Sequence, residues 1–240
     1  MANRFLLIFL LTAIFSFSQE KPVVVLELFT SQGCSSCPPA DKVLDKIKHS
    51  ADPSSVIPIA YHVDYWDYIG WKDPFASNKY TNKQRDYAQK FYSSSIYTPQ
   101  LVINGDEHFV GSNEIKINRK IKQILHRKSS SNSISISDIK TSDDKVLFSY
   151  QINGKIKKHK ISYLLIIDER ITSVKRGENR NRVLKNTNIV VREKSEVLNV
   201  KEGKAEIAIP KIVSKKDKLR LVVLVKDKES FITTGIQVTL

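Results

Sequence analysis

Long hydrophobic runs are almost absent from this sequence. The run at residues 5–15 is interrupted only by Thr12, and it is far shorter than the ~20 apolar residues that a membrane-spanning helix needs. Arg4 precedes it and small residues follow it up to Ser18, which is the three-part pattern of a secretory signal peptide. A membrane anchor is the alternative. We therefore expect residues 1–18 to be a cleaved signal peptide and the mature protein, from Gln19, to be secreted or periplasmic.

Acidic residues are also scarce, with 25 Asp and Glu against 39 Lys and Arg. The imbalance is uneven. Residues 19–127 carry 14 basic and 12 acidic side chains, whereas residues 128–240 carry 24 and 13. The basic C-terminal half predicts attraction to an acidic envelope surface such as a membrane face or a polyanionic polymer. The alternative is a solvated surface that only maintains solubility. Nucleic acid is not an expected partner outside the cytoplasm.

Residues 19–127 alternate strand and helix patterns. Residues 23–30 are almost continuously apolar and β-branched, which predicts a strand buried on both faces. A helix follows, with an apolar stripe at Ala40, Val43, Leu44 and Ile47. Later patterns predict a strand at 56–63, a helix near 80–91, a hairpin at 101–110 and a helix at 117–125. The order β-α-β-α-β-β-α resembles a thioredoxin-like domain in its minimal form. In that fold the second strand lies at a sheet edge, where Pro58 is tolerated.

In the second half of the chain, apolar residues recur with a period of two. Residues 128–133 are polar and serine-rich, which is typical of a linker. From residue 134 to residue 240, short apolar segments alternate with polar residues and turns. Strands at this spacing without helical patterns predict an antiparallel β-sandwich-like domain. We therefore expect an α/β thioredoxin-like domain at 19–127, followed by a β-rich domain at 134–240.

The chain contains only two cysteines, Cys34 and Cys37. Joining them closes a very short loop, so a disulfide here stabilises the fold little. A structural zinc site usually uses two cysteine pairs, but two thiolates suit Cu(I), with His62 or His108 as a further ligand. Redox chemistry explains more, because a helix N-terminus stabilises the reactive thiolate, and Pro38 and Pro39 place the pair in a first helical turn. Redox, metal-handling and merely structural interpretations all stay open from the residues alone.

Three other residues are candidates for supporting roles. Pro99 directly precedes the predicted strand at 101–103 and matches the cis-proline of the thioredoxin fold. That resemblance implies that the backbone of Thr98 lies beside the disulfide and pairs with a substrate chain. A trans-proline that begins a strand is the alternative. Glu27 is a carboxylate in an apolar strand. It either lies under the helix start and accepts a proton from Cys37, or it is held by a lysine or turned to a sheet edge.

The segment at residues 62–71 contains both tryptophans of the chain. Since the first two strands are predicted to be parallel, this segment emerges at the same sheet edge as the cysteines. We expect it to form a wall near the active site, with His62, Asp64 and Trp66 as candidates for substrate binding. A local aromatic core is the alternative.

Four strings, ELFTSQGCSSCPPAD, YHVDYWDYIGWKDPF, YTPQLVING and RGENRNR, resemble a family of secreted bacterial thioredoxin-like proteins classed as a domain of unknown function. The resemblance covers most of the mature chain. It implies a thioredoxin-like N-terminal half and a β-rich C-terminal half, and it supplies no substrate. Residues 175–182 match the basic stretch of the family. This stretch is either a docking loop or only a turn.

The function expected from the sequence is that of an exported thiol–disulfide oxidoreductase. Cys34 would be the accessible nucleophile of the reduced protein and Cys37 the resolving thiol. No cofactor and no metal is expected, and the redox partner would be a protein or a small thiol. The alternatives are a Cu(I)-handling envelope protein and a non-enzymatic binding module in which the basic β-domain binds the partner.

Overall fold

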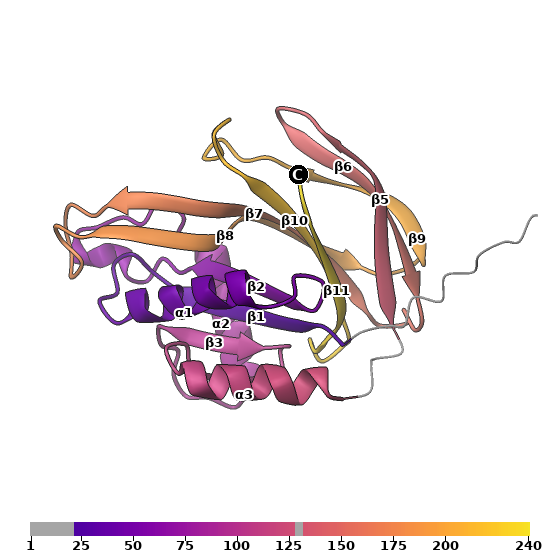
Figure 1. Ribbon diagram of the computed structural model, residues 1–240, viewed down its shortest axis with the longest axis horizontal. Coiled ribbons are helices and arrows are strands. Elements are labelled where there is room, and N and C mark those ends of the chain that lie inside the picture. The colour runs from indigo at the N-terminus through magenta and orange to yellow at the C-terminus, as the bar shows by residue number, and fades with distance from the viewer. Residues whose placement is uncertain (1–21, 128–131) are drawn as a thin grey trace, which may run out of the picture.

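An eight-stranded mixed sheet extends through most of the molecule (Figure 1). The computed structural model describes residues 22–127 and 132–240, so the predicted signal peptide and most of the predicted linker lie outside the described residues. No helix in these two ranges is long and apolar enough to cross a membrane. In chain order, the elements are β1 (Val24–Thr30), α1 (Cys37–Ser50), β2 (Val56–His62), η1 (Asp67–Ile69), α2 (Asn78–Lys90), β3 (Gln100–Ile103), β4 (Glu107–Val110), α3 (Glu114–Leu125), β5 (Ser133–Thr141), β6 (Lys145–Asn153), β7 (Lys160–Ser173), β8 (Val183–Val197), β9 (Glu202–Ala208), β10 (Leu219–Lys226) and β11 (Ile232–Thr239).

The strands form two sheets. The large sheet has the order β11-β10-β7-β8-β2-β1-β3-β4, and a separate antiparallel sheet has the order β5-β6-β9. β1 pairs with β2 in parallel and with β3 in antiparallel orientation. The predicted order of strands and helices in the first half is confirmed, with the 3₁₀ turn η1 added between β2 and α2. The protein is a mixed α/β structure.

Helices cover both faces of the N-terminal part of the large sheet. Alternate residues of β1 point to opposite faces, as the pleat of a strand requires. Leu26 and Leu28 pack in a cluster with α1 and α3. Val25 and Phe29 pack on the other face, with Tyr80 and Tyr87 of α2. β1 is therefore buried along its whole length, as its apolar sequence predicts.

The large sheet crosses the boundary that the sequence predicts between two domains. β8 pairs with β2 in parallel, through Ala60 and Ile189, and β7, β10 and β11 continue the sheet beyond it. β2 is thus an interior strand, not the edge strand that Pro58 suggested. The pairing of β2 with β8 is short. Next to it, the guanidinium of Arg220 donates a hydrogen bond to the Pro58 carbonyl at 3.3 Å, so a side chain provides the donor for this backbone oxygen.

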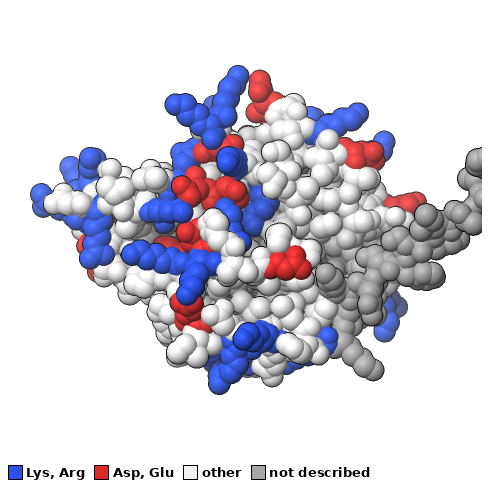
Figure 2. Space-filling view, viewed as in Figure 1, with Lys and Arg blue, Asp and Glu red and all other residues white. Residues whose placement is uncertain are grey.

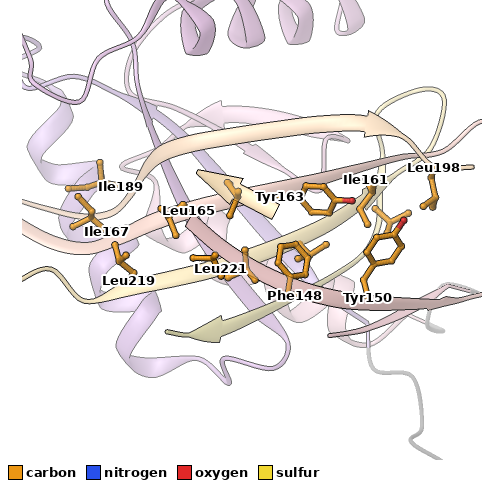
Figure 3. Packing of buried hydrophobic residues seen from close by; sticks show 14 of the residues in the cluster. Phe148, Tyr150, Ile161, Tyr163, Leu165, Ile167, Ile189, Leu198, Leu219 and Leu221 are labelled. Carbon is orange, nitrogen blue, oxygen red and sulfur yellow. The ribbon is translucent and has the colours of Figure 1, made fainter. Parts of the chain in front are cut away.

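The C-terminal half contains a sandwich that shares one layer with the N-terminal half. β5, β6 and β9 pack over the face of β7 and β10 that points away from α2. Figure 3 shows the side chains of β6, β7 and β10 that meet there. Phe148 of β6 meets Tyr163 of β7 edge to face, with ring centroids 5.3 Å apart. All eight residues of β10 are buried, as expected for a strand with packed layers on both faces. A period-two pattern identifies such strands but not the neighbours with which they pair.

β7 and β8 form a long hairpin, with 14 and 15 residues in its two strands. Its turn, residues 174–182, projects beyond the sheet toward the start of α1 (Figure 1). Lys185 of β8 lies 3.2 Å from Asp45 of α1, which links the hairpin to that helix. The hairpin thereby brings the basic stretch of the second half to the cysteines of the first.

Candidate active site

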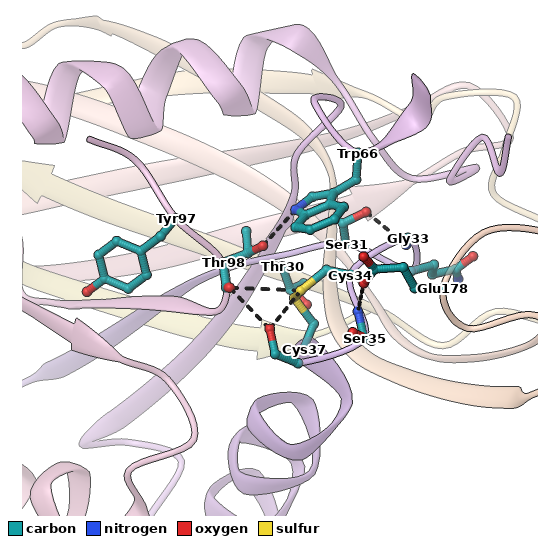
Figure 4. The surroundings of a disulfide bond; sticks show 12 residues. Thr30, Ser31, Gly33, Cys34, Ser35, Cys37, Trp66, Tyr97, Thr98 and Glu178 are labelled. Carbon is teal, nitrogen blue, oxygen red and sulfur yellow. Dashed lines mark hydrogen bonds between the residues drawn. A yellow bond between two sulfur atoms is a disulfide. The ribbon is translucent and has the colours of Figure 1, made fainter. Parts of the chain in front are cut away.

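Cys34 and Cys37 form a disulfide at the N-terminus of α1 (Figure 4). Their Cα atoms are 5.5 Å apart, within the range of ordinary disulfides. Cys37 is the first residue of α1, and the two prolines that follow occupy the first turn, where no intrahelical N–H bond is lost. Both cysteines are fully buried, whereas Ser35 and Ser36 between them are exposed. In the disulfide form Cys34 is therefore covered, unlike the accessible nucleophile that the sequence predicts for the reduced protein.

The residues around Pro99 lie directly against the disulfide. The Thr98–Pro99 peptide bond is cis, as predicted. The Thr98 carbonyl oxygen is 3.9 Å from the Cys34 sulfur and accepts a hydrogen bond from the Ser36 hydroxyl at 3.4 Å. Trp66 donates from Nε1 to the Thr98 hydroxyl at 2.7 Å (Figure 4). The fold thus brings Thr98, Pro99 and Trp66 together with the cysteines.

The turn of the β7–β8 hairpin holds the cysteine turn from the other side. Asn179 is fully buried, and its amide donates to the carbonyl oxygens of both Gln32 and Cys34 at 2.9 Å. Glu178 accepts a hydrogen bond from the Ser35 N–H at 2.9 Å (Figure 4). Gly177 has a φ of +73°, a conformation that favours glycine, and a Cβ there would lie 3.1 Å from the end of the Ile69 side chain, which would have to shift. The RGENRNR string is therefore a docking loop within the molecule itself.

Gln32 connects the cysteine turn to three other segments. Its backbone N–H donates to Asp73 at 2.8 Å, and its side-chain amide donates to Thr172 at 3.1 Å and to Asn186 at 2.9 Å. Its side-chain oxygen accepts from the Trp71 indole at 3.1 Å. Because Gln32 is fully buried, these bonds fix the position of the turn relative to β7, β8 and the loop after β2.

His62 lies in the interior and does not line an open surface. Its Nδ1 is 2.7 Å from the Asp73 carboxylate, and both side chains are fully buried. Burial alone would lower the pKa of His62, but Asp73 raises it above its ordinary value. Burial would likewise raise the pKa of Asp73, and His62 lowers it. The pair lies in the interior beneath Gln32, so His62 is not part of the surface beside the disulfide.

Asp41 is a buried carboxyl one helical turn after Cys37, on the same face of α1. Thr30 and Asn186 donate hydrogen bonds to it at 3.3 and 3.4 Å. Burial raises its pKa to about 7, against an ordinary value of 3.8. This carboxyl therefore changes its protonation state near neutral pH.

Glu27 lies on the opposite face of the sheet from α1. It accepts a hydrogen bond from Tyr87, and its carboxylate is 3.2 Å from the ammonium of Lys226 and 3.3 Å from that of Lys83. Burial alone would raise its pKa, but the two lysines lower it to about 2. Of the two interpretations of Glu27, the one in which a lysine holds it agrees with this geometry, and a proton relay to Cys37 does not.

The remaining predicted residue, Asp64, has a local structural contact. Its carboxylate accepts a hydrogen bond from the Thr81 hydroxyl at 2.5 Å, which ties the loop after β2 to the first turn of α2. Within residues 22–127 and 132–240, no three His, Cys, Asp or Glu side chains are placed to hold a metal ion. Two histidines were considered from the sequence as a further Cu(I) ligand. His62 is bonded to Asp73 instead, and Nδ1 of His108 lies 3.1 Å from the Tyr97 hydroxyl.

Comparison with known proteins identifies the family. A family model described as "Protein of unknown function (DUF1223)" matches residues 25–226. The chain belongs to this family. An X-ray structure of a protein from Agrobacterium tumefaciens is 25% identical, with a TM-score of 0.67, over 93% of this chain and 96% of its own. A DUF3823 family protein from Bacteroides ovatus is 18% identical over 45% of this chain and 55% of its own, with a TM-score of 0.29. No curated protein matches the chain.

The span matched by the DUF1223 model includes the cysteine turn, Pro99 and the hairpin turn. Sequence reasoning found the first two and did not assign partners to the third. Asp41 was also missed, although its spacing of four from Cys37 on an amphipathic helix is a usable signal. Gln32, Asn179 and Asp73 carry no such signal, because their roles depend on long-range contacts.

Replacing Asn179 with alanine tests whether the hairpin turn holds the cysteine turn. We expect the free energy of unfolding to fall by about 1–3 kcal/mol, since the buried Gln32 carbonyl loses its donor. Alkylation of the reduced cysteines should also become faster. Urea unfolding and iodoacetamide kinetics measure the two effects. Lys175→Gln, an exposed change in the same turn, is the control and should stay within about 0.5 kcal/mol. Wild-type stability and alkylation rate in Asn179→Ala would contradict this role.

Proposed function

We propose that this DUF1223 protein is an exported thiol–disulfide oxidoreductase whose N-terminal half is thioredoxin-like. One observation carries the proposal: a Cys34–Cys37 disulfide at a helix N-terminus faces the Thr98 carbonyl that precedes a cis-proline. The helix N-terminus favours a thiolate at the first cysteine, and the adjacent carbonyl can pair with the backbone of a bound chain. Export rests on the signal-peptide pattern of residues 1–18.

The proposed reaction is disulfide exchange. The Cys34 thiolate attacks one sulfur of a partner disulfide, forming a mixed disulfide and releasing the other partner sulfur as a thiolate. Cys37 then attacks the Cys34 sulfur, which closes the Cys34–Cys37 bond and releases the second partner sulfur. Two electrons pass to the partner, and the two thiol protons of the protein end on the released sulfurs. The reverse sequence oxidises a partner dithiol.

The contacts of the two sulfurs support this division of roles. The Cys34 sulfur lies beside Ser36 and Thr98, at the edge where the exposed serines form the surface. Cys37 lies within the first turn of α1, with Asp41 one turn further on the same helix face. A carboxyl with a pKa of about 7 is suited to exchange a proton with the Cys37 thiol at neutral pH.

The test is a redox titration of the mature chain, from Gln19, in glutathione buffers, together with two single variants. We expect a reversible two-electron transition. Cys37→Ala should keep the attacking thiol and accumulate mixed disulfides with a partner, because nothing resolves them. Cys34→Ala should lose exchange and trap nothing. Non-reducing gels and mass spectrometry distinguish these outcomes. Trapping by Cys34→Ala alone would reverse the two roles, and unchanged exchange in both variants would remove the proposal.

A further inference from the structure

The turn of the β7–β8 hairpin presents a cluster of basic side chains beside the disulfide. Lys175, Arg176, Arg180 and Arg182, here called the basic rim, are all exposed. Figure 2 shows Lys and Arg side chains gathered at the end of the molecule where Figure 1 places this turn. Within the described residues, none of the four forms an ion pair with a carboxylate; Arg182 donates only to the neutral amide of Asn179, at 3.0 Å. The basic rim therefore carries four positive charges against one carboxylate in the same turn, that of Glu178.

The basic rim is held in a fixed place relative to the cysteines. Asn179, in the middle of the turn, bonds to the Cys34 carbonyl. Backbone hydrogen bonds close the turn on itself, from Val174 to Arg182 and from Asn181 back to Val174. Gly177 lies close to Ile69 of η1, since a Cβ at this position would be 3.1 Å from the Ile69 side chain. Side chains that extend from so constrained a turn are presented to any molecule that approaches Ser35.

Two residues near the basic rim, Glu178 and Tyr68, bear on the kind of ligand that this surface can bind. Glu178, the one acidic residue of the turn, already places a carboxylate on the backbone N–H of Ser35. That donor is already occupied, so an incoming carboxylate would have to be recognised by the ammonium and guanidinium groups of the basic rim. Tyr68 of η1, next to Ile69, is 82% exposed and offers an aromatic face that a peptide can cover.

We propose that the partner whose disulfide this site exchanges is an acidic polypeptide, with Asp or Glu close to its cysteine, recruited by the basic rim. The inference rests on the proposed oxidoreductase function and names its substrate class. Exchange follows the balanced sequence given above, with the polypeptide as the disulfide that is reduced. Opposite charge at a site raises the rate of encounter, and salt weakens the effect.

The experiment uses three short peptides that contain the same intramolecular disulfide and differ only in flanking residues: glutamates, glutamines or lysines. The reduced mature protein is mixed with each peptide, and thiol release is followed at low and high salt. We expect the glutamate peptide to react roughly tenfold faster than the glutamine peptide at low salt, and the lysine peptide to be slowest. The differences should shrink as salt rises.

Two matched double variants locate the effect. Arg176→Gln/Arg180→Gln should remove most of the preference for the glutamate peptide over the glutamine peptide, taken as the ratio of the two rates within the same variant. Lys201→Gln/Lys204→Gln removes the same charge from exposed positions in and next to β9, at the far end of the molecule, and should keep the preference. Equal rates for the three peptides would overturn the inference while leaving the oxidoreductase intact. A preference that survives in the rim variant would also overturn it, and failure to reduce any peptide would remove the proposed function with it.

Discussion

Replacing Glu27 with glutamine is expected to lower the free energy of unfolding by about 3–5 kcal/mol. Glu27 is fully buried between the ammonium groups of Lys226 and Lys83, and Lys83 also lies 2.7 Å from Glu193. These four side chains balance one another, with two charges of each sign. Neutralising one carboxylate leaves two buried ammonium groups against one carboxylate, and an uncompensated buried charge is costly.

A double-mutant cycle with Lys226→Met tests this explanation. Each single variant leaves one unbalanced charge, whereas the double variant Glu27→Gln/Lys226→Met restores neutrality. The double variant should therefore lose less stability than the sum of the two singles, by more than about 1 kcal/mol. Glu229→Gln, at an exposed position, is the control. Additive losses in the cycle, measured by urea unfolding, would show that the ion pairs do not act as a unit.

The pH dependence of this group has a definite sign. The pKa of Glu27 is about 2 in the folded protein and 4.5 ordinarily, so its contribution to stability is present above pH 4.5. That contribution disappears as the pH falls toward 2. Since Glu27 faces away from α1, folded Glu27→Gln protein should exchange disulfides at the wild-type rate. A large loss of exchange in the folded variant would instead connect Glu27 to the cysteines.

The parts of the fold that local sequence patterns specify were predictable. The apolar run of β1, the stripe of α1 with its two early prolines and the position of Pro99 each depend on residues close in the chain. The pairing of β8 with β2 was not predictable, because it joins Ala60 to Ile189 through one irregular contact. The same is true of Glu27, whose partner Lys226 is far away in the chain. A strand with a lone carboxylate signals a buried partner but does not identify it.

The candidate site also has one part that local sequence predicts and another that depends on long-range contacts. Its cysteine pair and cis-proline follow from motifs, whereas residues of the second half of the chain hold the cysteine turn in place. Asn179 and Glu178 reach the cysteine turn only because β7 and β8 form a long hairpin that extends past the end of β2. His62 shows the opposite error. Its position at the end of β2 suggested a surface role, but Phe75 and Asp73 of the following loop pack over it.

Replacing Asp41 with asparagine is expected to remove a loss of stability that the wild type shows between pH 4 and pH 7. The folded pKa of about 7 lies above the ordinary value of 3.8, so folding favours the protonated carboxyl. The stability linked to this proton is fully present below pH 4 and is lost as the pH rises through 7. At about 1.4 kcal/mol per pKa unit, the loss is on the order of 4 kcal/mol.

Asparagine keeps an oxygen that can accept the bonds from Thr30 and Asn186, and it carries no charge at any pH. Asp41→Asn should therefore match the wild type near pH 4 and exceed its stability at pH 8, in urea unfolding at a series of pH values. His62 and Asp73 also face this carboxyl, and the raised pKa of His62 adds a loss of stability above pH 6.5. Asp73 and Asp41 both raise the pKa of His62, so this loss becomes smaller in the variant, where only Asp73 remains. The matched control is Asp45→Asn, one turn further along α1 and half-buried at the surface, which should keep the wild-type slope. A wild-type slope in Asp41→Asn as well would mean that this carboxyl is ionised throughout that range and that its burial is compensated by His62.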